Sequence, residues 1–330
     1  MGPEKTTRSL PVPPSLIQFI NEGSKFIVAG HKEPDGDCIG SQLALCSFLR
    51  RLGKKAAACS AGPFKRTEVL PYAGSFNAAP GRDELSGARV IVTDCSELER
   101  TGDLLPFLEG LPLAIIDHHA TGKMAGEAGY LDIHAPSVTF MITKLIEAFG
   151  GTPSREEAEL LFFGLCTDTG FFRHTGEGEA ETFSLAAKLI EAGASPKKTF
   201  LAMNGNRSLD SRILMGLVLA RTSAHYGGKL LVSTEAYEDT RRFGLEGRDS
   251  DTLYQLLQSV KGVECIMIVR QESPGRCTVG LRSRDAVDVS RIAGKYGGGG
   301  HKNAAGLSMD GVISDLLPLL IAEFKEPLCL

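Results

Sequence analysis

The twelve residues FIVAGHKEPDGD, at positions 26–37, decide the fold that we expect for this chain. They begin with an apolar run at 26–30, which is typical of a strand buried on both faces. A polar segment with one histidine and two aspartates follows at once, and residues 39–52 then show the apolar spacing of a helix. A buried strand that leads through a polar turn into a helix is the unit from which parallel α/β sheets are built.

The same alternation continues along the first half of the chain. Residues 55–59, 89–93 and 113–116 predict further strands, and residues 137–149, 154–165 and 179–192 predict helices. Ser137 can cap the first of these helices, and the second has glutamate at its capping-box position. The expected fold class is therefore α/β, with a mostly parallel sheet.

The pattern changes after a long helical stretch. Residues 195–220 predict helix with an interruption at 204–206, whereas hairpins are expected at 225–233, around Gly227-Gly228, and at 263–283, around Pro274-Gly275. A helix at 287–296, a four-glycine loop and a helix at 313–324 complete a smaller α+β unit. We expect a first domain at 1–194, a helical linker at 195–222 and a substrate-binding domain at 223–330, with a cleft between the two domains. The length of 330 residues agrees with two domains of about 150 residues each.

Composition limits the kinds of partner and compartment. The net charge of −4 argues against a protein that coats long nucleic acid through bulk positive charge, but it allows a local basic pocket for a small anion. The eight cysteines contain no C-x-x-C pair, and most lie in apolar runs, which is typical of a reducing compartment. No apolar run approaches the ~18 residues that span a bilayer. We therefore expect a cytoplasmic protein without a membrane partner.

Acidic residues and histidines gather where the predicted strands and one helix end. The candidates are His31, Asp35 and Asp37 after the first strand, Asp94 after 89–93, Asp117, His118 and His119 after 113–116, and Asp168 at a helix end. Because ligands of open α/β sheets bind at the carboxyl ends of the strands, we expect most of these side chains to converge there. A single aspartate at a strand end is more often a turn or cap residue, but four such clusters together favour a metal site.

The donor set suits two divalent cations. Bridging carboxylates must offset the repulsion between two neighbouring ions, and Asp94 and Asp168 are candidates for that role. Such a pair of ions can activate a water molecule for attack on phosphorus. Carboxylates and imidazoles without cysteine favour Mn²⁺ over structural zinc, with Mg²⁺ or Co²⁺ as alternatives.

The glycine run at 297–300 is not a Walker loop, because the lysine and hydroxyl residue of that motif do not follow it at the required spacing. It could be a flexible turn. We favour a backbone nest, in which a series of N–H groups surrounds an anion. The expected substrate-binding residues in this region are Arg282, Ser283, Gly298, Gly299, Gly300, His301 and Asn303. Arg282 offers a bidentate fork for phosphate.

Together these motifs resemble a known family. His31-x-x-Pro34-Asp35-Gly36-Asp37-x-x-Gly40-Ser41, Asp94, Asp117-His118-His119 and Thr167-Asp168-Thr169-Gly170 are similar to the ordered motifs of the DHH phosphoesterases. The segment from Gly298 to Gly306 resembles the signature of the DHH-associated domain. Within the family the chain is most similar to the compact bacterial nanoRNases, which degrade very short RNA and dephosphorylate 3′-phosphoadenosine 5′-phosphate.

The resemblance implies roles for individual residues. His31, Asp35 and Asp94 would hold one metal, and Asp37, Asp94, His118 and Asp168 the other. Asp117 and His119 would be catalytic residues that orient an imidazole or face the phosphate, and Arg173 would contact substrate. Two departures stand out. Cys38 replaces an expected small residue, and His174 follows Arg173 where tyrosine is common. Neither residue is expected to touch a proposed metal ligand.

The expected function is a two-metal hydrolase that cleaves short oligoribonucleotides to 5′-mononucleotides and dephosphorylates 3′-phosphoadenosine 5′-phosphate. Three alternatives remain: a phosphodiesterase for linear or cyclic dinucleotides, an inorganic pyrophosphatase, and a non-catalytic nucleotide sensor. Partners would be short RNA and small phosphorylated nucleotides, and a homodimer is left open.

Overall fold

A computed structural model describes residues 9–119, 126, 128–205, 207–245, 247–284 and 286–329 of the chain. The chain divides into two compact units, the first ending at Asn206 and the second beginning at Arg207. Each unit has its own sheet and its own apolar cores. Within the described part of the chain, no helix has the length and apolar character that crossing a membrane requires. The seven cysteines whose side chains are described are all unpaired and buried.

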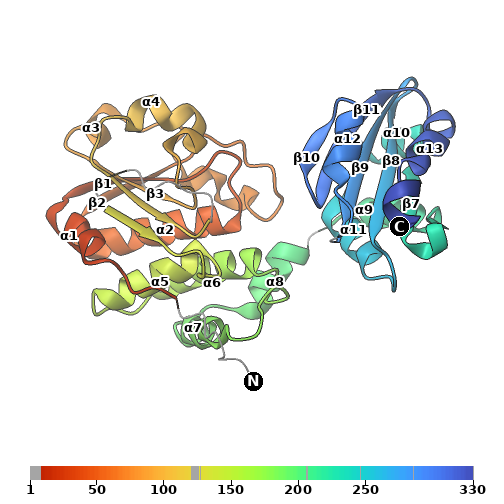
Figure 1. Cartoon of the computed structure of the whole chain (residues 1–330). Coiled ribbons are helices and arrows are strands. Elements are labelled where there is room, and N and C mark those ends of the chain that lie inside the picture. The colour runs from red at the N-terminus through yellow and green to blue at the C-terminus, as the bar shows by residue number, and fades with distance from the viewer. Residues whose placement is uncertain are drawn as a thin grey trace. The chain divides into compact units, whose positions relative to one another are not determined.

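The first unit is built on a parallel sheet (Figure 1). Its strand order is β2-β1-β3-β4-β5, and every neighbouring pair is parallel. The strands are β1 (Lys25–Ala29), β2 (Lys55–Cys59), β3 (Arg89–Thr93), β4 (Leu113–Asp117) and β5 (Ala128–Leu131). This is the α/β fold that the sequence predicts.

Alternate residues of each strand enter different cores, because successive side chains point to opposite faces of a sheet. Phe26, Val28 and Ile91 face a large core shared with helices, whereas Ile27 and Val90 face a smaller core on the other side. The helices of this unit are α1 (Pro14–Glu22), α2 (Gly36–Arg51), α3 (Arg82–Leu85), α4 (Leu105–Leu108), α5 (Val138–Ala148), α6 (Arg155–Asp168), α7 (Ala180–Glu191) and α8 (Pro196–Asn204). Helices α1, α2, α5, α6 and α7 contribute to the large core, and α4 to the smaller one.

Several helix ends follow directly from side-chain caps. The Ser137 hydroxyl accepts from the Phe140 N–H at the start of α5, and Ser154 with Glu157 forms a capping box on α6, as predicted. Helix α2 begins at Gly36, earlier than the predicted 39, because the Asp35 carboxylate accepts hydrogen bonds from the backbone N–H groups of Asp37 and Cys38. Apolar spacing alone could not show that this polar segment already belongs to the helix.

The second unit has a mixed sheet of order β10-β11-β9-β8-β7-β6. Only the β7–β8 pair is parallel among the pairings described for this sheet. Its strands are β6 (Ser223–His225), β7 (Leu230–Glu235), β8 (Cys265–Ser273), β9 (Arg276–Ser283), β10 (Gly299–His301) and β11 (Ala304–Asp310). Helices α12 (Val289–Lys295), α13 (Ile313–Ala322) and α14 (Lys325–Cys329) lie along its core on one face, and α9 (Leu209–Ala220), α10 (Tyr237–Phe243) and α11 (Ser250–Gln258) along a second core.

Both predicted hairpins are present, β6–β7 and β8–β9. The predicted four-glycine loop needs correction, because Gly299–His301 forms strand β10 and pairs with β11. Glycine is required there by close approach of the backbone. A Cβ atom at Gly298 would lie 2.3 Å from the Gly306 carbonyl oxygen, and one at Gly300 would lie 2.4 Å from that of Ala304.

Candidate metal centre and substrate-binding face

Asp94 occupies the centre of a cluster at the carboxyl ends of the parallel strands. It follows β3 directly, is 2% exposed, and has a backbone φ of 63°, a left-handed conformation that side-chain-bearing residues rarely adopt. Its carboxylate lies near three imidazole rings that come from the ends of β1 and β4. Unusual backbone conformations of this kind are concentrated at functional sites.

His31 lies on one side of this carboxylate. Its Nε2 atom is 3.3 Å from Asp94 Oδ2 and 4.0 Å from Asp35 Oδ1. The other ring nitrogen, Nδ1, lies 2.8 Å from the Lys32 carbonyl oxygen, which leaves Nε2 facing the carboxylates. The residues predicted to share one ion, His31, Asp35 and Asp94, are therefore neighbours in the structure.

His118 lies on the other side, with two more predicted ligands. Its Nε2 atom is 3.2 Å from Asp168 Oδ2 and 3.7 Å from Asp94 Oδ1, while its Nδ1 atom lies 3.1 Å from the Ala135 carbonyl oxygen. Ligand atoms of Asp37, His118 and Asp168 all lie within 4.8 Å of one another. The structure thus brings together a second group of the residues predicted for metal binding.

Asp37 is held by the start of another helix. Its carboxylate accepts hydrogen bonds from the backbone N–H groups of Val138 and Thr139 at 2.6 and 2.9 Å, and from the Thr139 hydroxyl at 2.7 Å. A carboxylate is favourable at a helix N-terminus, since the unpaired N–H groups there carry partial positive charge. Helix α5 therefore fixes Asp37 in position from outside the cluster.

Glycines allow the helices to approach closely enough for Asp37 to meet Asp168. A Cβ atom at Gly36 would lie 2.4 Å from the Thr167 side chain, and one at Gly40 would lie 2.6 Å from the Leu160 carbonyl oxygen. Helices α2 and α6 could not pack at this distance with larger residues at these two positions. The glycines of the first motif thus have a packing role that brings the carboxylates together.

Asp117 organises the turn that carries the two adjacent histidines. Its Oδ1 atom accepts hydrogen bonds from the backbone N–H groups of His118 and His119 at 2.8 and 3.2 Å, and lies 2.7 Å from His119 Nδ1. The nearby imidazole of His119 outweighs the effect of burial and lowers the pKa of Asp117. This contact matches the orienting role implied for Asp117, although a catalytic role for either residue stays a prediction.

A buried atom without a partner shows that this donor set fits cations. Among the described residues, Asp94 Oδ1 is buried with no hydrogen-bond partner, and the buried Nε2 atom of His118 faces the carboxylates of Asp168 and Asp94. Leaving such atoms unpaired costs free energy unless something else binds them. Oxygen and imidazole donors aimed at one place are suitable ligands for divalent metal ions.

The electrostatics of the metal-free cluster agree with this reading. Burial and the neighbouring carboxylates raise the pKa of Asp94 well above its usual range. Burial and the Asp168 carboxylate raise the pKa of Asp37 to about 7. Burial alone would lower the pKa of His118, but the surrounding carboxylates, led by Asp168, raise it to about 10. In the metal-free protein, bound protons therefore offset the negative charge of the carboxylates, which metal ions would offset when bound.

These shifts predict how stability depends on pH. The pKa of Asp37 is about 7 in the folded protein and about 4 in the unfolded chain, so the folded state binds more protons between these pH values. The contribution of Asp37 to the free energy of unfolding therefore falls as the pH rises from about 4 to about 7. His118 adds stability below about pH 6.5, and that stability is lost as pH rises toward 10. We expect the Tm of metal-free protein to fall between about pH 5 and pH 9. Saturating Mn²⁺ should weaken this trend, because metal competes with protons.

Thermal unfolding at a series of pH values checks this expectation. Asp37→Asn removes one of the titrating groups, so its metal-free Tm should change less with pH between about 4 and 7 than that of the wild-type protein. A wild-type, metal-free Tm that rises across the same range would contradict the assignment.

Cys38 belongs to this cluster, although the sequence did not predict it there. Ligand atoms of His31, Cys38 and Asp94 lie within 4.8 Å of one another, although Cys38 was expected to lie away from the ligands. Its position in the sequence, next to Asp37, was the available signal. Because Cys38 is in the first turn of α2, its side chain can point toward the strand ends where Asp94 lies.

In the second unit, strand register places two predicted substrate-binding residues on one face of the sheet. Arg282 of β9 pairs with Ala304 of β11, which pairs with His301 of β10. Directly opposed residues of antiparallel strands project to the same face, so Arg282 and His301 flank a small alanine. The next row on this face consists of Gly280, Gly306 and Gly299. The glycines of this row carry no side chains next to the row of the arginine.

Tyr254 is a further residue of this face that the sequence did not reveal. The Arg282 guanidinium carbon lies 4.4 Å from the centre of the Tyr254 ring, within the range of a cation–π contact. The ring covers Gly280, where an added Cβ atom would lie 2.0 Å from the tyrosine oxygen. Tyr254 thus restrains the orientation of Arg282, since a guanidinium over a ring keeps its N–H groups directed sideways.

Several other predicted substrate-binding residues of the second unit make hydrogen bonds within the fold. Ser283 faces the opposite side of β9, is 3% exposed, and donates its hydroxyl to the Val287 carbonyl oxygen at 2.7 Å. The Asn303 amide donates to the Arg284 carbonyl oxygen. The N–H groups of Gly297 and Gly298 donate to the carbonyl oxygens of Gly294 and Ala293 at the end of α12. The N–H group of Gly298 is thus already paired within the fold. The nest, and substrate contacts by Ser283, Gly298, Gly299, Gly300 and Asn303, stay predictions.

Arg173 follows the Asp168 motif in the first unit. Its side chain is exposed, and its NH2 group lies 3.2 Å from Nε2 of His174. Gly170, Phe171 and Phe172 just before it all have positive φ values, of 56°, 56° and 69°. Contact between Arg173 and substrate stays a prediction.

Comparison with known proteins agrees with this architecture. The family model described as the DHH family, N-terminal domain, matches residues 25–165, and the DHHA1 domain model matches residues 227–328. The chain belongs to the DHH family and is a phosphoesterase.

The relatives span nearly the whole chain. It is 33% identical to the bifunctional oligoribonuclease and PAP phosphatase NrnA of Thermus thermophilus, over 87% of this chain and 85% of that protein. It is 28% identical to the protein of the same name from Bacillus subtilis, over 91% and 96%. An exopolyphosphatase-related protein from Bacteroides fragilis has the same fold, with a TM-score of 0.78, 21% identity and 96% coverage of both chains.

Proposed function

We propose that this chain is a metal-dependent hydrolase that cleaves short oligoribonucleotides to 5′-mononucleotides and removes phosphate from 3′-phosphoadenosine 5′-phosphate. The observation that carries the proposal is the convergence of His31, His118 and Asp168 around the buried carboxylate of Asp94, whose Oδ1 atom has no hydrogen-bond partner among the described residues. The names of the relatives from Thermus thermophilus and Bacillus subtilis supply the substrate class.

Each residue of the cluster has a proposed role. His31, Asp35 and Asp94 would hold one divalent ion, and Asp37, Asp94, His118 and Asp168 the other. When bound, such ions lower the pKa of water and offset the negative charge that develops on the phosphoryl group. Asp117 would hold His119 in a fixed orientation beside this place, where an imidazole can donate to a phosphate oxygen.

Mn²⁺ is the ion that we propose. Carboxylate oxygens outnumber other donors in the cluster, which favours a hard cation. A probable manganese-dependent inorganic pyrophosphatase of Streptococcus mutans is 31% identical over 44% of this chain, and this likeness supports the choice.

The second unit would bind the part of the substrate that does not react. Arg282 and His301 share a face beside a row of glycines, so a phosphate bound there could approach the backbone closely. We also propose the assignments 1–194, 195–222 and 223–330 for the metal domain, the linker and the substrate domain. A cytoplasmic location and a homodimer stay predictions.

A comparison of substrates tests the proposal. Purified protein with Mn²⁺ should be most active on oligoribonucleotides of about two to five residues and weak on long single strands, because a net charge of −4 offers no long basic track. 3′-Phosphoadenosine 5′-phosphate should also be hydrolysed. The measurement is kcat/KM for each substrate under one set of conditions.

The same assay tests the alternative functions, when cyclic dinucleotides and pyrophosphate are added to the substrates. A cyclic-di-AMP phosphodiesterase of Geobacillus thermodenitrificans is 23% identical over 90% of this chain and 46% of that protein, so cyclic dinucleotides belong in the comparison. Preference for a cyclic dinucleotide, for pyrophosphate or for long RNA would each contradict the proposed substrate class. No turnover of any substrate would favour a nucleotide sensor.

A further inference from the structure

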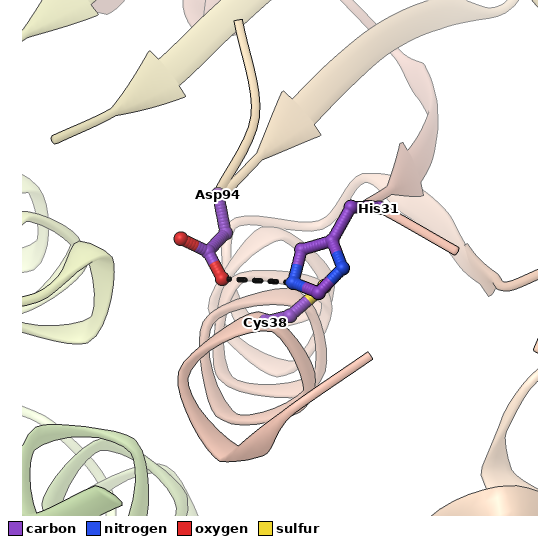
Figure 2. A group of neighbouring side chains, drawn as sticks. All are labelled: His31, Cys38 and Asp94. Carbon is purple, nitrogen blue, oxygen red and sulfur yellow. Dashed lines mark ion pairs between the residues drawn. The ribbon is translucent and has the colours of Figure 1, made fainter. Parts of the chain in front are cut away.

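Cys38 lies beside His31 and Asp94 (Figure 2). The dashed line in the figure joins the His31 ring to the Asp94 carboxylate, and the cysteine sulfur lies next to that ring. Candidate ligand atoms of the three residues all lie within 4.8 Å of one another, and Cys38 is completely buried. A sulfur donor thus accompanies the nitrogen and oxygen donors of this group.

The local structure is arranged around the sulfur. A Cβ atom at Gly30 would lie 2.3 Å from Cys38 Sγ, so only glycine at the end of β1 leaves room for the sulfur here. The Gln42 amide, one helical turn later in α2, donates to Cys38 Sγ at 3.2 Å. Hydrogen bonds from N–H groups to sulfur are a common way in which proteins stabilise and tune metal-bound thiolates.

The Asp94 carboxylate supplies the oxygen donor of this group. Asp94 Oδ1 is buried without a hydrogen-bond partner in the described residues, and Asp94 as a whole is 2% exposed. Oδ1 faces His118 and His119, each at 3.7 Å, whereas the other oxygen, Oδ2, faces His31 at 3.3 Å on the side where Cys38 lies. A cation bound beside Asp94 and His31 would therefore lie within reach of the Cys38 sulfur.

We infer that Cys38 Sγ is a ligand of the ion held by His31 and Asp94, so that this half of the metal centre binds borderline cations such as Zn²⁺ and Co²⁺ in addition to Mn²⁺. The inference rests on the proposed metal centre and adds a specific donor to it. On coordination the thiol gives its proton to solvent and binds as thiolate. Sulfur and nitrogen ligands of one tetrahedral zinc ion lie about 3.5 Å apart, so donor atoms separated by up to 4.8 Å must approach one another by up to about 1.3 Å when they bind a single ion.

Sulfur changes which metals the site prefers. Mg²⁺ and Mn²⁺ favour oxygen donors, whereas thiolate and imidazole donors favour Zn²⁺ and Co²⁺. Loss of the sulfur should therefore weaken Zn²⁺ and Co²⁺ binding by about ten- to a hundredfold, with a much smaller effect, about threefold or less, on Mn²⁺. The sequence, taken alone, favours Mn²⁺ because it does not place a cysteine among the ligands.

Cobalt spectroscopy tests the assignment without relying on activity. Metal-stripped full-length protein is titrated with Co²⁺ while near-ultraviolet and visible absorption are recorded, and calorimetry gives the amount of Co²⁺ bound. The wild-type protein should show a sulfur-to-cobalt charge-transfer band that is absent from Cys38→Ala and from Cys38→Ser. Cys46→Ala is the matched control, because Cys46 is a buried cysteine of the same helix, and it should retain the band.

The possible results separate this inference from the proposed function. Visible cobalt absorption without the charge-transfer band, or a band that survives in both Cys38 variants, would overturn the assignment of Cys38 and leave the metal centre intact. A band lost in Cys46→Ala would also overturn it. Failure of the wild-type protein to bind any Co²⁺ would contradict the metal centre itself.

Discussion

Asp94→Ala is expected to abolish hydrolysis of short RNA, with a loss of roughly a thousandfold or more in kcat. Asp94 is the carboxylate that faces His31, His118 and His119, so its removal takes a shared ligand from both proposed ions. The fold should remain, because the metal-free cluster loses an unfavourably buried carboxylate whose pKa is already raised. Turnover at saturating Mn²⁺, bound metal per chain and Tm are the measurements.

Asp132→Asn provides a matched control for this variant. Asp132 is also fully buried and directly follows a strand of the same sheet, but its carboxylate accepts hydrogen bonds from the Leu10 and His134 N–H groups. It should keep turnover within a few-fold of the wild-type value. If Asp94→Ala retained a tenth of wild-type turnover, its role as a ligand shared between two ions would have to be abandoned.

Arg282→Ala is expected to lower kcat/KM for a dinucleotide by about ten- to a thousandfold. A charge-assisted contact to phosphate contributes about 1.5–3 kcal/mol, and misplacement of the reacting phosphate adds to the loss. A small activated ester such as bis-p-nitrophenyl phosphate has no distal nucleotide, so its slow hydrolysis should be nearly unchanged. His301→Ala should show the same selectivity, because both residues lie on one face of the sheet.

Two further variants make the comparison specific. Arg276 lies at the start of the same strand, is 61% exposed at its side chain and faces Asp310, so Arg276→Ala should leave both substrates unaffected. Asp168→Ala should lose both activities, since it belongs to the metal cluster. Equal losses on the two substrates in Arg282→Ala and His301→Ala would show that these residues serve the chemistry or the fold instead.

Much of the metal domain could be predicted because its signals are local. Apolar runs at 26–30 and 89–93 mark buried strands, and the polar residues just beyond them must lie at one edge of a parallel sheet. Capping at Ser137 and Ser154 could also be predicted, because it needs only residues three positions apart.

Other features depend on contacts between distant segments. The glycines at 297–300 look like a loop, since they lack side chains, but β11 approaches so closely that no larger residue fits at Gly298 or Gly300. The stacking of Tyr254 on Arg282 joins two elements with no shared sequence pattern. Cys38 lies near Asp94 only because the end of β3 meets the start of α2 in the folded chain, and no local pattern in the sequence shows this contact.

Metal stoichiometry measured together with turnover tests the central claim most directly. Metal-stripped protein is titrated with Mn²⁺, and bound metal and dinucleotide hydrolysis are measured in the same samples. The account predicts no release of 5′-mononucleotides without metal and full activity only when about two ions are bound per chain. Full activity with one ion per chain, or without metal, would contradict it.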